Sequence, residues 1–222
     1  MVVERGISTS GRGEPLCALA RPFGRGAAAD RARREAQVLS EREALVKAHA
    51  SYRVFPVIAR RGDVFDLGEF SVRVPSFAAY GDDVEALAAG ACTIGPDLER
   101  RVSELFAARR PFLALALDRL GTEALYRLSD RTLASIRGAA KAQGLKAADQ
   151  ANPGDRGIEL DQQAAVLAIA GAAECGVTLT SSGMLSPRKS VSFVVAMGRN
   201  LPEQTVFGRC RRCPSRDRCP VR

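Results

Sequence analysis

The sequence contains no tryptophan and only one histidine, His49, in 222 residues. It has no apolar run near the ~20 residues that a membrane-spanning helix needs. Its first residues lack the short apolar core and small-residue cleavage site of a secretory signal. We therefore expect a cytoplasmic protein with no membrane partner. Hydrophobic residues make up 46% of the chain and charged residues 26%, which is typical of a globular protein with one sizeable core or two small ones.

The chain also lacks any helix-turn-helix, zinc-finger or aromatic RNA-binding motif, although its net charge is +8. The excess charge lies at the two ends. Residues 1–35 carry seven arginines against four acids, and residues 208–222 carry six arginines against one aspartate. Residues 36–207 are balanced, with twenty basic and twenty acidic side chains. A nucleic-acid-binding domain concentrates basic residues on its folded part, so we expect no nucleic-acid partner.

Three of the six cysteines lie within the last thirteen residues, in the spacing C-x2-C-x5-C: Cys210, Cys213 and Cys219. A C-x-x-C pair can bring two thiolates from one turn to a single metal. Five arginines surround the motif and would stabilise the negative charge of a thiolate-ligated cluster. A closed zinc site needs four ligands, and no second C-x-x-C pair or nearby histidine completes one. The tail therefore predicts an iron–sulfur cluster or an open metal site, with zinc or free redox-labile thiols as alternatives.

The other three cysteines, Cys17, Cys92 and Cys175, are scattered singly. Cys92 and Cys175 stand in alanine-rich, apolar surroundings, where a free cysteine behaves as a small hydrophobe. We interpret both as core residues. One of them could still supply a fourth ligand to the tail.

The pattern divides the chain into three segments. Residues 1–29 are rich in Gly, Arg and Ala without periodicity and predict a disordered or weakly ordered extension. Residues 30–207 carry the helix and strand patterns, and residues 208–222 form the Cys/Arg-rich tail. Strands separated by helices without a βαβ repeat favour one α+β domain. Helices are predicted over 30–50, 82–89, 96–109, 120–128, 130–143 and 161–174. Strands are predicted over 52–58, 64–74, 91–94, 177–180 and 190–196, with a hairpin near residues 61–63, a turn-rich loop at 150–157 and either state at 111–117.

Several motifs, taken in order, resemble the activation domain of cobalamin-dependent methionine synthase. That family has a Pro-Gly turn, a helix, a Gly-(Val/Ile)-x-Leu-Thr element and a Pro-x-x-Ser-Val-Ser element. Here these read Pro153-Gly154, Gly176-Val177-Thr178-Leu179-Thr180 and Pro187-Arg188-Lys189-Ser190-Val191-Ser192. Two upstream segments resemble short, stand-alone members of the same family: Thr93-Ile94-Gly95, and Asp118-Arg119-Leu120-Gly121 followed by Glu123-Ala124. The cysteine tail resembles these stand-alone members too. The resemblance covers roughly residues 50–200.

The resemblance implies a single α+β domain with a mixed, largely antiparallel sheet flanked by helices. It also implies a role in the reductive reactivation of a corrinoid-dependent methyltransferase, from cob(II)alamin to methylcobalamin. Its cofactors would be S-adenosylmethionine and the cobalamin of the partner, a corrinoid protein or methyltransferase. The residues at the family's cofactor-binding positions are Glu123, Asn152, Pro153, Gly154 and Asp155. A cluster on the cysteine tail would then be an electron entry point.

The turn departs from the family pattern at four positions, and two of these departures bear on ligand binding. The family loop reads Arg-Pro-Ala-Pro-Gly-Tyr, whereas this chain has Gln150-Ala151-Asn152-Pro153-Gly154-Asp155. Gln150 therefore replaces the arginine that pairs with the ligand carboxylate, and it cannot form a cationic, bidentate contact. Asp155 replaces the aromatic residue and adds negative charge. The alternative interpretation is a non-catalytic module that docks a corrinoid protein and has a zinc or free-thiol tail.

Overall fold

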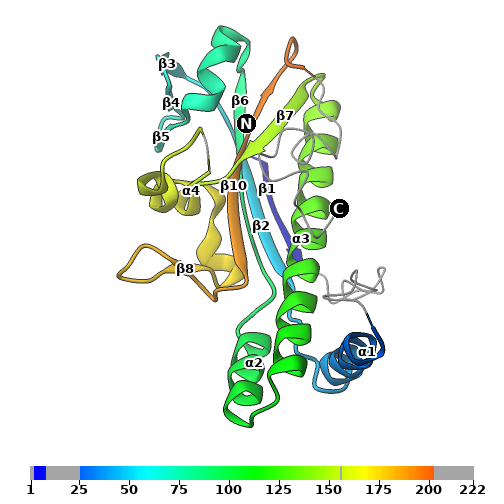
Figure 1. Cartoon of the computed structure of the whole chain (residues 1–222). Helices are drawn as coiled ribbons and strands as arrows, with labels where there is room; N and C mark the ends of the chain where they lie inside the picture. Colours follow the sequence, from blue (N-terminus) through cyan, green and yellow to red (C-terminus); the bar gives the residue numbers. More distant parts are fainter. Residues whose placement is uncertain (1–2, 9–25, 156, 203–222) are drawn as a thin grey trace.

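The computed structural model describes residues 3–8, 26–155 and 157–202. Its centre is a five-stranded sheet in the order β1-β2-β6-β10-β7 (Figure 1). All neighbouring strands in this sheet pair antiparallel, so the predicted α+β class and largely antiparallel sheet are confirmed. The strands are β1 (Val3–Ser8), β2 (His49–Pro56), β6 (Ala86–Thr93), β7 (Lys146–Ala151) and β10 (Ser190–Gly198).

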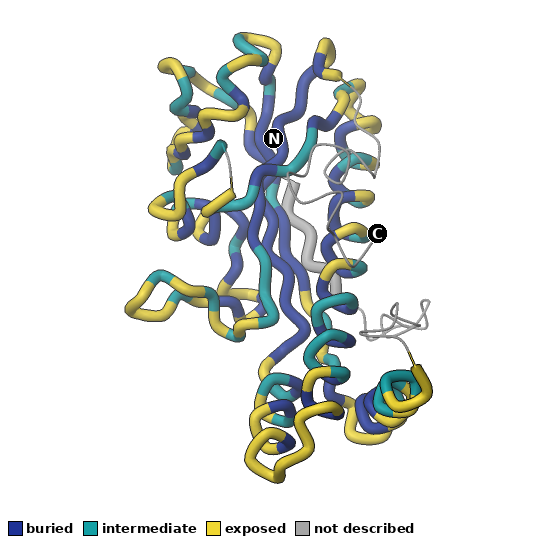
Figure 2. Tube along the Cα trace, in the orientation of Figure 1, coloured by how far each residue is buried: buried dark blue, intermediate teal, exposed yellow. Residues whose placement is uncertain are grey.

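Strand β6 is buried along its whole length, because helices cover both faces of the sheet (Figure 2). Small residues suit this position: the ring of Phe193 on β10 lies 2.6 Å from where a Cβ on Gly90 would stand. The predicted helix at 82–89 is wrong. Residues Pro75–Asp83 form a 3-10 helix, η1, and β6 follows. Alanine favours helices intrinsically, but burial between two layers decides the outcome here.

One face of the sheet is covered by α3 (Pro111–Ala142), a single helix of 32 residues. The sequence predicted two separate helices here, at 120–128 and 130–143, and left 111–117 as either a strand or the start of a helix. Its buried side chains run as one stripe, from Leu113 to Ala140, into a core shared with β2, β6 and β10. A continuous stripe of this kind stabilises a long helix through packing, whatever the local propensities.

The opposite face carries short elements. They are η2 (Leu160–Gln162), α4 (Gln163–Ala170) and η3 (Ala172–Cys175). The helix predicted at 161–174 is interrupted at Gly171, which has a φ of +63°. The small sheet β3 (Ala59–Arg61), β4 (Val64–Asp66) and β5 (Ser71–Arg73) lies on the same face and contributes to the same core. The predicted hairpin is confirmed, and Gly62 supplies its turn with a φ of +65°. A second hairpin joins β8 (Thr178–Leu179) to β9 (Leu185–Ser186).

At one end of the molecule, α1 (Ala27–Arg42) and α2 (Asp97–Ala107) pack against the start of α3 (Figure 1). The predicted helix at 96–109 is confirmed by α2. Residues 3–8 form the edge strand β1, although the sequence assigned them to an extension without regular structure. None of the described helices combines the length and apolarity needed to cross a membrane.

Candidate functional site

The Pro-Gly turn follows directly on strand β7. Asp155 N donates to Asn152 O at 2.9 Å, which closes a four-residue turn with Pro153 second and Gly154 third. Gly154 has a φ of +90°, so this is the type II geometry that favours glycine at the third position. Gly154 N then donates to Ile158 O at 3.0 Å, which folds the following chain back onto the turn. Gln150, which the sequence placed in the loop, is a residue of β7.

Side-chain amides attach this turn to the sheet. Gln150 Nε2 donates to Asn152 Oδ1 at 2.9 Å, and Asn152 Nδ2 donates to Ser192 O on β10 at 3.1 Å. From the other face, Gln163 of α4 donates its Nε2 to the hydroxyl of Ser192, and both residues are buried. Gln150 Oε1 is buried and has no hydrogen-bond partner within residues 26–155 and 157–202. An unpaired buried carbonyl costs free energy, so this oxygen is an acceptor suited to a ligand donor.

Beside the turn, β10 extends past its neighbour. Strand β7 pairs with β10 from Val194 to Gly198, whereas β6 pairs with β10 from Ser190 to Met197. Residues 190–193 therefore have β6 on one side and no described strand on the other. The carbonyl of Ser192 points to this open side, since it accepts from Asn152. In an antiparallel strand the N–H and C=O of one residue point the same way, so the Ser192 N–H faces the open side too.

Helix α3 carries the other predicted site residue. Glu123 Oε1 accepts from Arg119 Nε at 3.1 Å, and their side chains are only 17% and 14% exposed. One turn earlier, Asp118 Oδ1 lies 2.9 Å from Lys189 Nζ, which also donates to Thr122 Oγ1 at 2.7 Å. These contacts join α3 to the chain just before β10. No hydrogen bond within the described residues links Glu123 to the turn, so the structure brings Asn152–Asp155 together but leaves Glu123 on a separate element.

The electrostatics of the turn are those of an acceptor site. Asp155 is exposed, and the neighbouring side chains Gln150 and Asn152 are neutral. Across residues 26–155 and 157–202, no arginine or lysine side chain hydrogen-bonds to residues 152–155. Such a site suits an ammonium or hydroxyl donor better than a carboxylate. The sequence did not point to Gln163 as part of this network, because a single glutamine in an apolar helix has no distinctive pattern.

The predicted metal ligands Cys210, Cys213 and Cys219 lie outside the described residues. Within the described ranges no group of three or more His, Cys, Asp or Glu could hold a metal ion. Cys92 and Cys175 are buried free thiols, which confirms their interpretation as core residues. Burial raises the pKa of the Cys92 thiol to about 12, and its Sγ lies 3.3 Å from Thr132 Oγ1. Cys92 is therefore a poor source of a thiolate ligand.

Comparison with known proteins rests on structure alone, since no family model and no curated protein sequence matches this chain. The chain has the fold of a methionine synthase reactivation domain, as the sequence motifs predicted. The solved structure that carries this comparison is titled "Crystal Structure of the MetH Reactivation Domain bound to AdoHcy". It matches with a TM-score of 0.67 over 93% of this chain and 81% of that chain, at 15% identity. The likeness establishes the fold of the chain.

Proposed function

We propose that this protein assists the reductive reactivation of a corrinoid-dependent methyltransferase, such as methionine synthase. The observation that carries this proposal is the likeness to the MetH reactivation domain over 93% of the chain. That domain was solved with AdoHcy, the product that S-adenosylmethionine leaves after methyl transfer. The order of the Pro-Gly, Gly-Val-Thr-Leu-Thr and Pro-x-x-Ser-Val-Ser motifs in the sequence supports the same function. We place the protein in the cytoplasm, with a corrinoid protein or methyltransferase as its partner.

S-adenosylmethionine would bind at the turn and the open part of β10. Glu123 and the turn Asn152–Asp155 are the residues proposed to hold it. The unpaired Gln150 Oε1 and the Asp155 carboxylate suit the ligand's ammonium group, and the positive φ of Gly154 lets the backbone approach closely. The Ser192 N–H is available for an acceptor on the ligand. Since Gln150 is neutral, the ligand carboxylate would be held less firmly than by an arginine.

The chemistry needs one electron and one methyl group. S-adenosylmethionine supplies the methyl group to the reduced cobalt of the partner's cobalamin and leaves as AdoHcy. Methyl transfer is effectively irreversible, so it traps an unfavourable one-electron reduction. The part played by this chain is to bind and orient the methyl donor and to cover the cobalamin of the partner.

We further propose that Cys210, Cys213 and Cys219 hold an iron–sulfur cluster that delivers this electron. After anaerobic reconstitution, we expect bound iron and thiolate-to-iron absorption in the visible range. Serine at all three positions should abolish both. One zinc per chain without iron, with unfolding on chelation, would instead identify a structural zinc site. If the protein binds neither iron nor zinc, the tail is one of free thiols.

Titration calorimetry with S-adenosylmethionine tests the turn. We expect saturable binding, weakened about tenfold or more by Asn152→Ala, because the variant releases the turn from both Gln150 and Ser192 O. Asn200→Ala is the matched control, since Asn200 also makes one side-chain hydrogen bond, to Asp83 Oδ1 at 3.1 Å, but lies after β10 at the far end of that strand. Binding unaffected by Asn152→Ala would exclude the turn as the ligand site.

The alternative is a module that docks a corrinoid protein without binding the methyl donor. It predicts a stable complex with a corrinoid protein but no heat of binding with S-adenosylmethionine. The decisive assay starts from methionine synthase in the cob(II)alamin state, with a reductant and S-adenosylmethionine. Return of methylcobalamin absorption only when this protein is present supports reactivation.

A further inference from the structure

A second candidate site lies at the other end of the molecule, between α1 and the corner where α2 turns into α3. Here a cavity of about 290 Å³ is lined on one side by one face of α1 and on the other by the corner residues 109–113. Its apolar lining comes from small and aliphatic side chains and from the exposed Phe112. The lining residues that matter for binding are Ala28, Arg31, Ala32, Arg109, Phe112 and Leu113.

Two arginines at this groove have no side-chain partner among the residues that the structure describes. Arg110 is paired with Glu35 across the groove, but Arg31 and Arg109 make no hydrogen bond or ion pair with any side chain in the described ranges. The groove thus has three guanidinium groups against one carboxylate. Two unpaired guanidinium groups beside an apolar wall suit a carboxylate that is attached to an apolar body, since arginine binds carboxylates in a bidentate manner.

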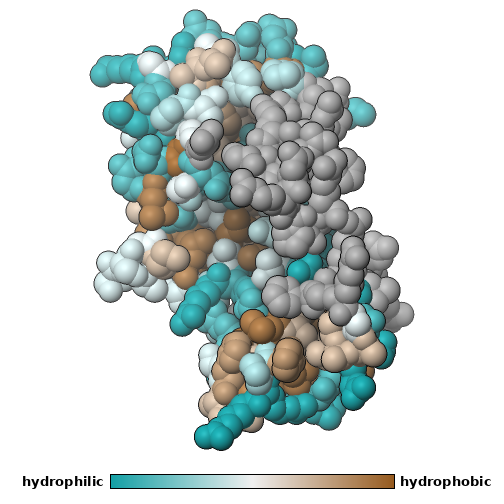
Figure 3. Space-filling model, viewed as in Figure 1, coloured by the Kyte–Doolittle hydropathy of each residue, from teal (hydrophilic) through white to brown (hydrophobic). Residues whose placement is uncertain are grey.

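The apolar surface continues outside the cavity. Eight large hydrophobic side chains are exposed in the described chain, and α1, α2 and the start of α3 carry four of them. Phe112 is 81% exposed, and the others are Val38, Phe106 and Leu115. Figure 3 shows apolar residues gathered over this end of the molecule. Exposed apolar side chains concentrated on one part of a surface mark an interaction site.

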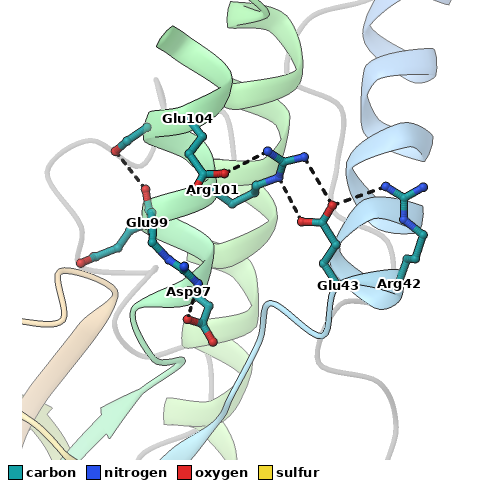
Figure 4. A network of polar contacts seen from close by, with 8 residues as sticks. Arg42, Glu43, Asp97, Glu99, Arg101 and Glu104 are labelled. Atoms are coloured by element: carbon teal, nitrogen blue, oxygen red, sulfur yellow. Dashed lines mark hydrogen bonds and ion pairs between the residues drawn. The ribbon is translucent and has the colours of Figure 1, made fainter. Parts of the chain in front are cut away.

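Ion pairs hold the walls of the groove in place. Arg101 of α2 lies between Glu43, at the end of α1, and Glu104, at N–O distances of 3.0 Å to each (Figure 4). Arg110 and Glu35 join the same two regions on the other side. These ion pairs therefore link the two walls of the groove to each other.

We propose that this groove docks an acidic segment of another protein, with a carboxylate on Arg31 and Arg109 and an apolar side chain against Phe112. The occupant is a protein segment because the apolar surface extends beyond the cavity, as in interfaces that combine an apolar centre with charged rims. Extended nucleic acid needs a wider basic surface than three guanidinium groups beside one carboxylate. This inference is independent of the proposed reactivation function.

Arg109 allows a test that separates binding from folding. It ends α2 in a Schellman motif: Arg110 N donates to Leu105 O at 2.9 Å, and Arg109 N donates to Phe106 O at 3.0 Å. Arg109 itself has a φ of +56°, a conformation that glycine adopts at lower cost. Arg109→Gly should therefore raise the melting temperature while it removes one guanidinium. Ala44→Gly, at the matching position after α1 with a φ of +49°, is the control that relieves similar strain without changing charge.

The probe is a short synthetic peptide of glutamates around one phenylalanine, labelled for fluorescence anisotropy and added to the full chain. We expect saturable binding that Arg109→Gly and Arg31→Gln each weaken about fivefold or more, as loss of a charge-assisted contact does. Phe112→Ser should weaken it as well, because the apolar contact is lost. Ala44→Gly should bind as the unchanged protein does. Arg61→Gln removes an equal charge from the remote β3–β4 hairpin and should change affinity by less than about twofold.

Three results would overturn the proposal. The first is an equal loss of binding in Arg61→Gln, which would mean attraction by net charge alone. The second is unchanged binding in Arg109→Gly despite the higher melting temperature. The third is binding of a short RNA or of phosphatidylglycerol vesicles that shows the same dependence on Arg31 and Phe112, because the groove would then serve a nucleic acid or a membrane surface.

Discussion

The turn after β7 and the groove beside α1 are organised on different physical principles. At the turn, neutral amides of Gln150 and Asn152 hold the backbone, and the unpaired group is a buried acceptor. At the groove, ion pairs hold the helices, and the unpaired groups are guanidinium donors beside exposed apolar side chains. A buried, uncharged frame with one open acceptor suits a small ligand with a donor group. An exposed, charged frame with an apolar patch suits a protein surface.

The long helix α3 connects the two regions. α3 contributes Phe112 and Leu113 to the groove, and it also carries Glu123, which we propose to hold the ligand together with the turn. The two regions therefore share one rigid element, and their separation depends on how α3 packs. Changes in the packing of α3 should disturb both regions, whereas changes at either end should disturb one.

The largest expected effect comes from Gly121→Val in α3. A Cβ at Gly121 would stand 2.7 Å from Leu98 Cδ2 of α2 and 3.2 Å from Ile94 Cδ1, both fully buried. We expect the free energy of unfolding to fall by about 1–3 kcal/mol, as overpacking does in a filled core. Urea denaturation followed by circular dichroism measures it. Binding at both regions should weaken together.

The matched control for this change is Gly138→Ala on the same helix. Gly138 is exposed, and nothing lies within 4 Å of a Cβ built there. Alanine should therefore stabilise α3 by about 0.5–1 kcal/mol through helix propensity alone. A loss of stability in both variants would mean that α3 tolerates no side chain at its glycines, and the close packing on Leu98 would not be the cause.

A smaller effect is expected from Gln150→Leu, which separates ligand binding from stability at the turn. The change removes the buried, unpaired Oε1 and also the hydrogen bond from Nε2 to Asn152 Oδ1, and these two losses act in opposite directions on stability. The free energy of unfolding should therefore stay within about 1 kcal/mol of that of the unchanged protein. Binding of S-adenosylmethionine should weaken about fivefold or more, because the ligand loses an acceptor. Calorimetry and urea denaturation on the same samples measure both. A lower free energy of unfolding with unchanged S-adenosylmethionine binding would mean that Gln150 stabilises the fold and does not contact the ligand.

The sequence predicted the helix α2, the β3–β4 hairpin and the strand β10 well, because each has a clear local pattern and matching turn residues. It failed at β6, where an alanine-rich stretch with helix-forming composition is the central strand. Strand β7 was missed for the same reason, since Lys146–Ala151 has no β-branched residue. Strand β6 forms because strands on both sides and layers on both faces enclose it. The edge strand β7 forms because it pairs with β10 and packs against α3, and one sequence window contains neither kind of information.

For the candidate site, the motif order correctly located the Pro-Gly turn. What no pattern contained was the link from Asn152 to Ser192 and from Gln163 to the same serine, at sequence separations of 40 and 29 residues. Contacts of this kind depend on strand register, which is set by the whole sheet. The groove beside α1 was not predicted, because its arginines belong to helices that are distant in sequence.

The smallest expected effect is at the charged end, from Asp97→Asn. The hydrogen bond from Lys47, at 2.6 Å, together with Arg100, at 2.8 Å, holds the pKa of Asp97 below its usual value. A lowered folded-state pKa adds stability above the unfolded-state pKa of about 4, and that stability is lost as the pH falls through the folded value. At pH 7 we expect Asp97→Asn to lower the free energy of unfolding by up to about 1 kcal/mol, and less in high salt.

The difference between Asp97→Asn and the unchanged protein should shrink as the pH falls below the unfolded-state pKa of about 4, because Asp97 becomes protonated in the unfolded chain first and in the folded chain at lower pH. Urea denaturation at pH 7, 5 and 3 measures it. Glu69→Gln is the control, because Glu69 is exposed and has no ion pair among the described residues. Asp97 begins α2 and makes its ion pairs with Lys47 and Arg100, so this variant should leave S-adenosylmethionine binding at the turn unchanged. A pH-independent loss of stability would mean that Asp97 stabilises the start of α2 through its geometry at the helix N-terminus. Its ion pairs with Lys47 and Arg100 would then contribute little to stability.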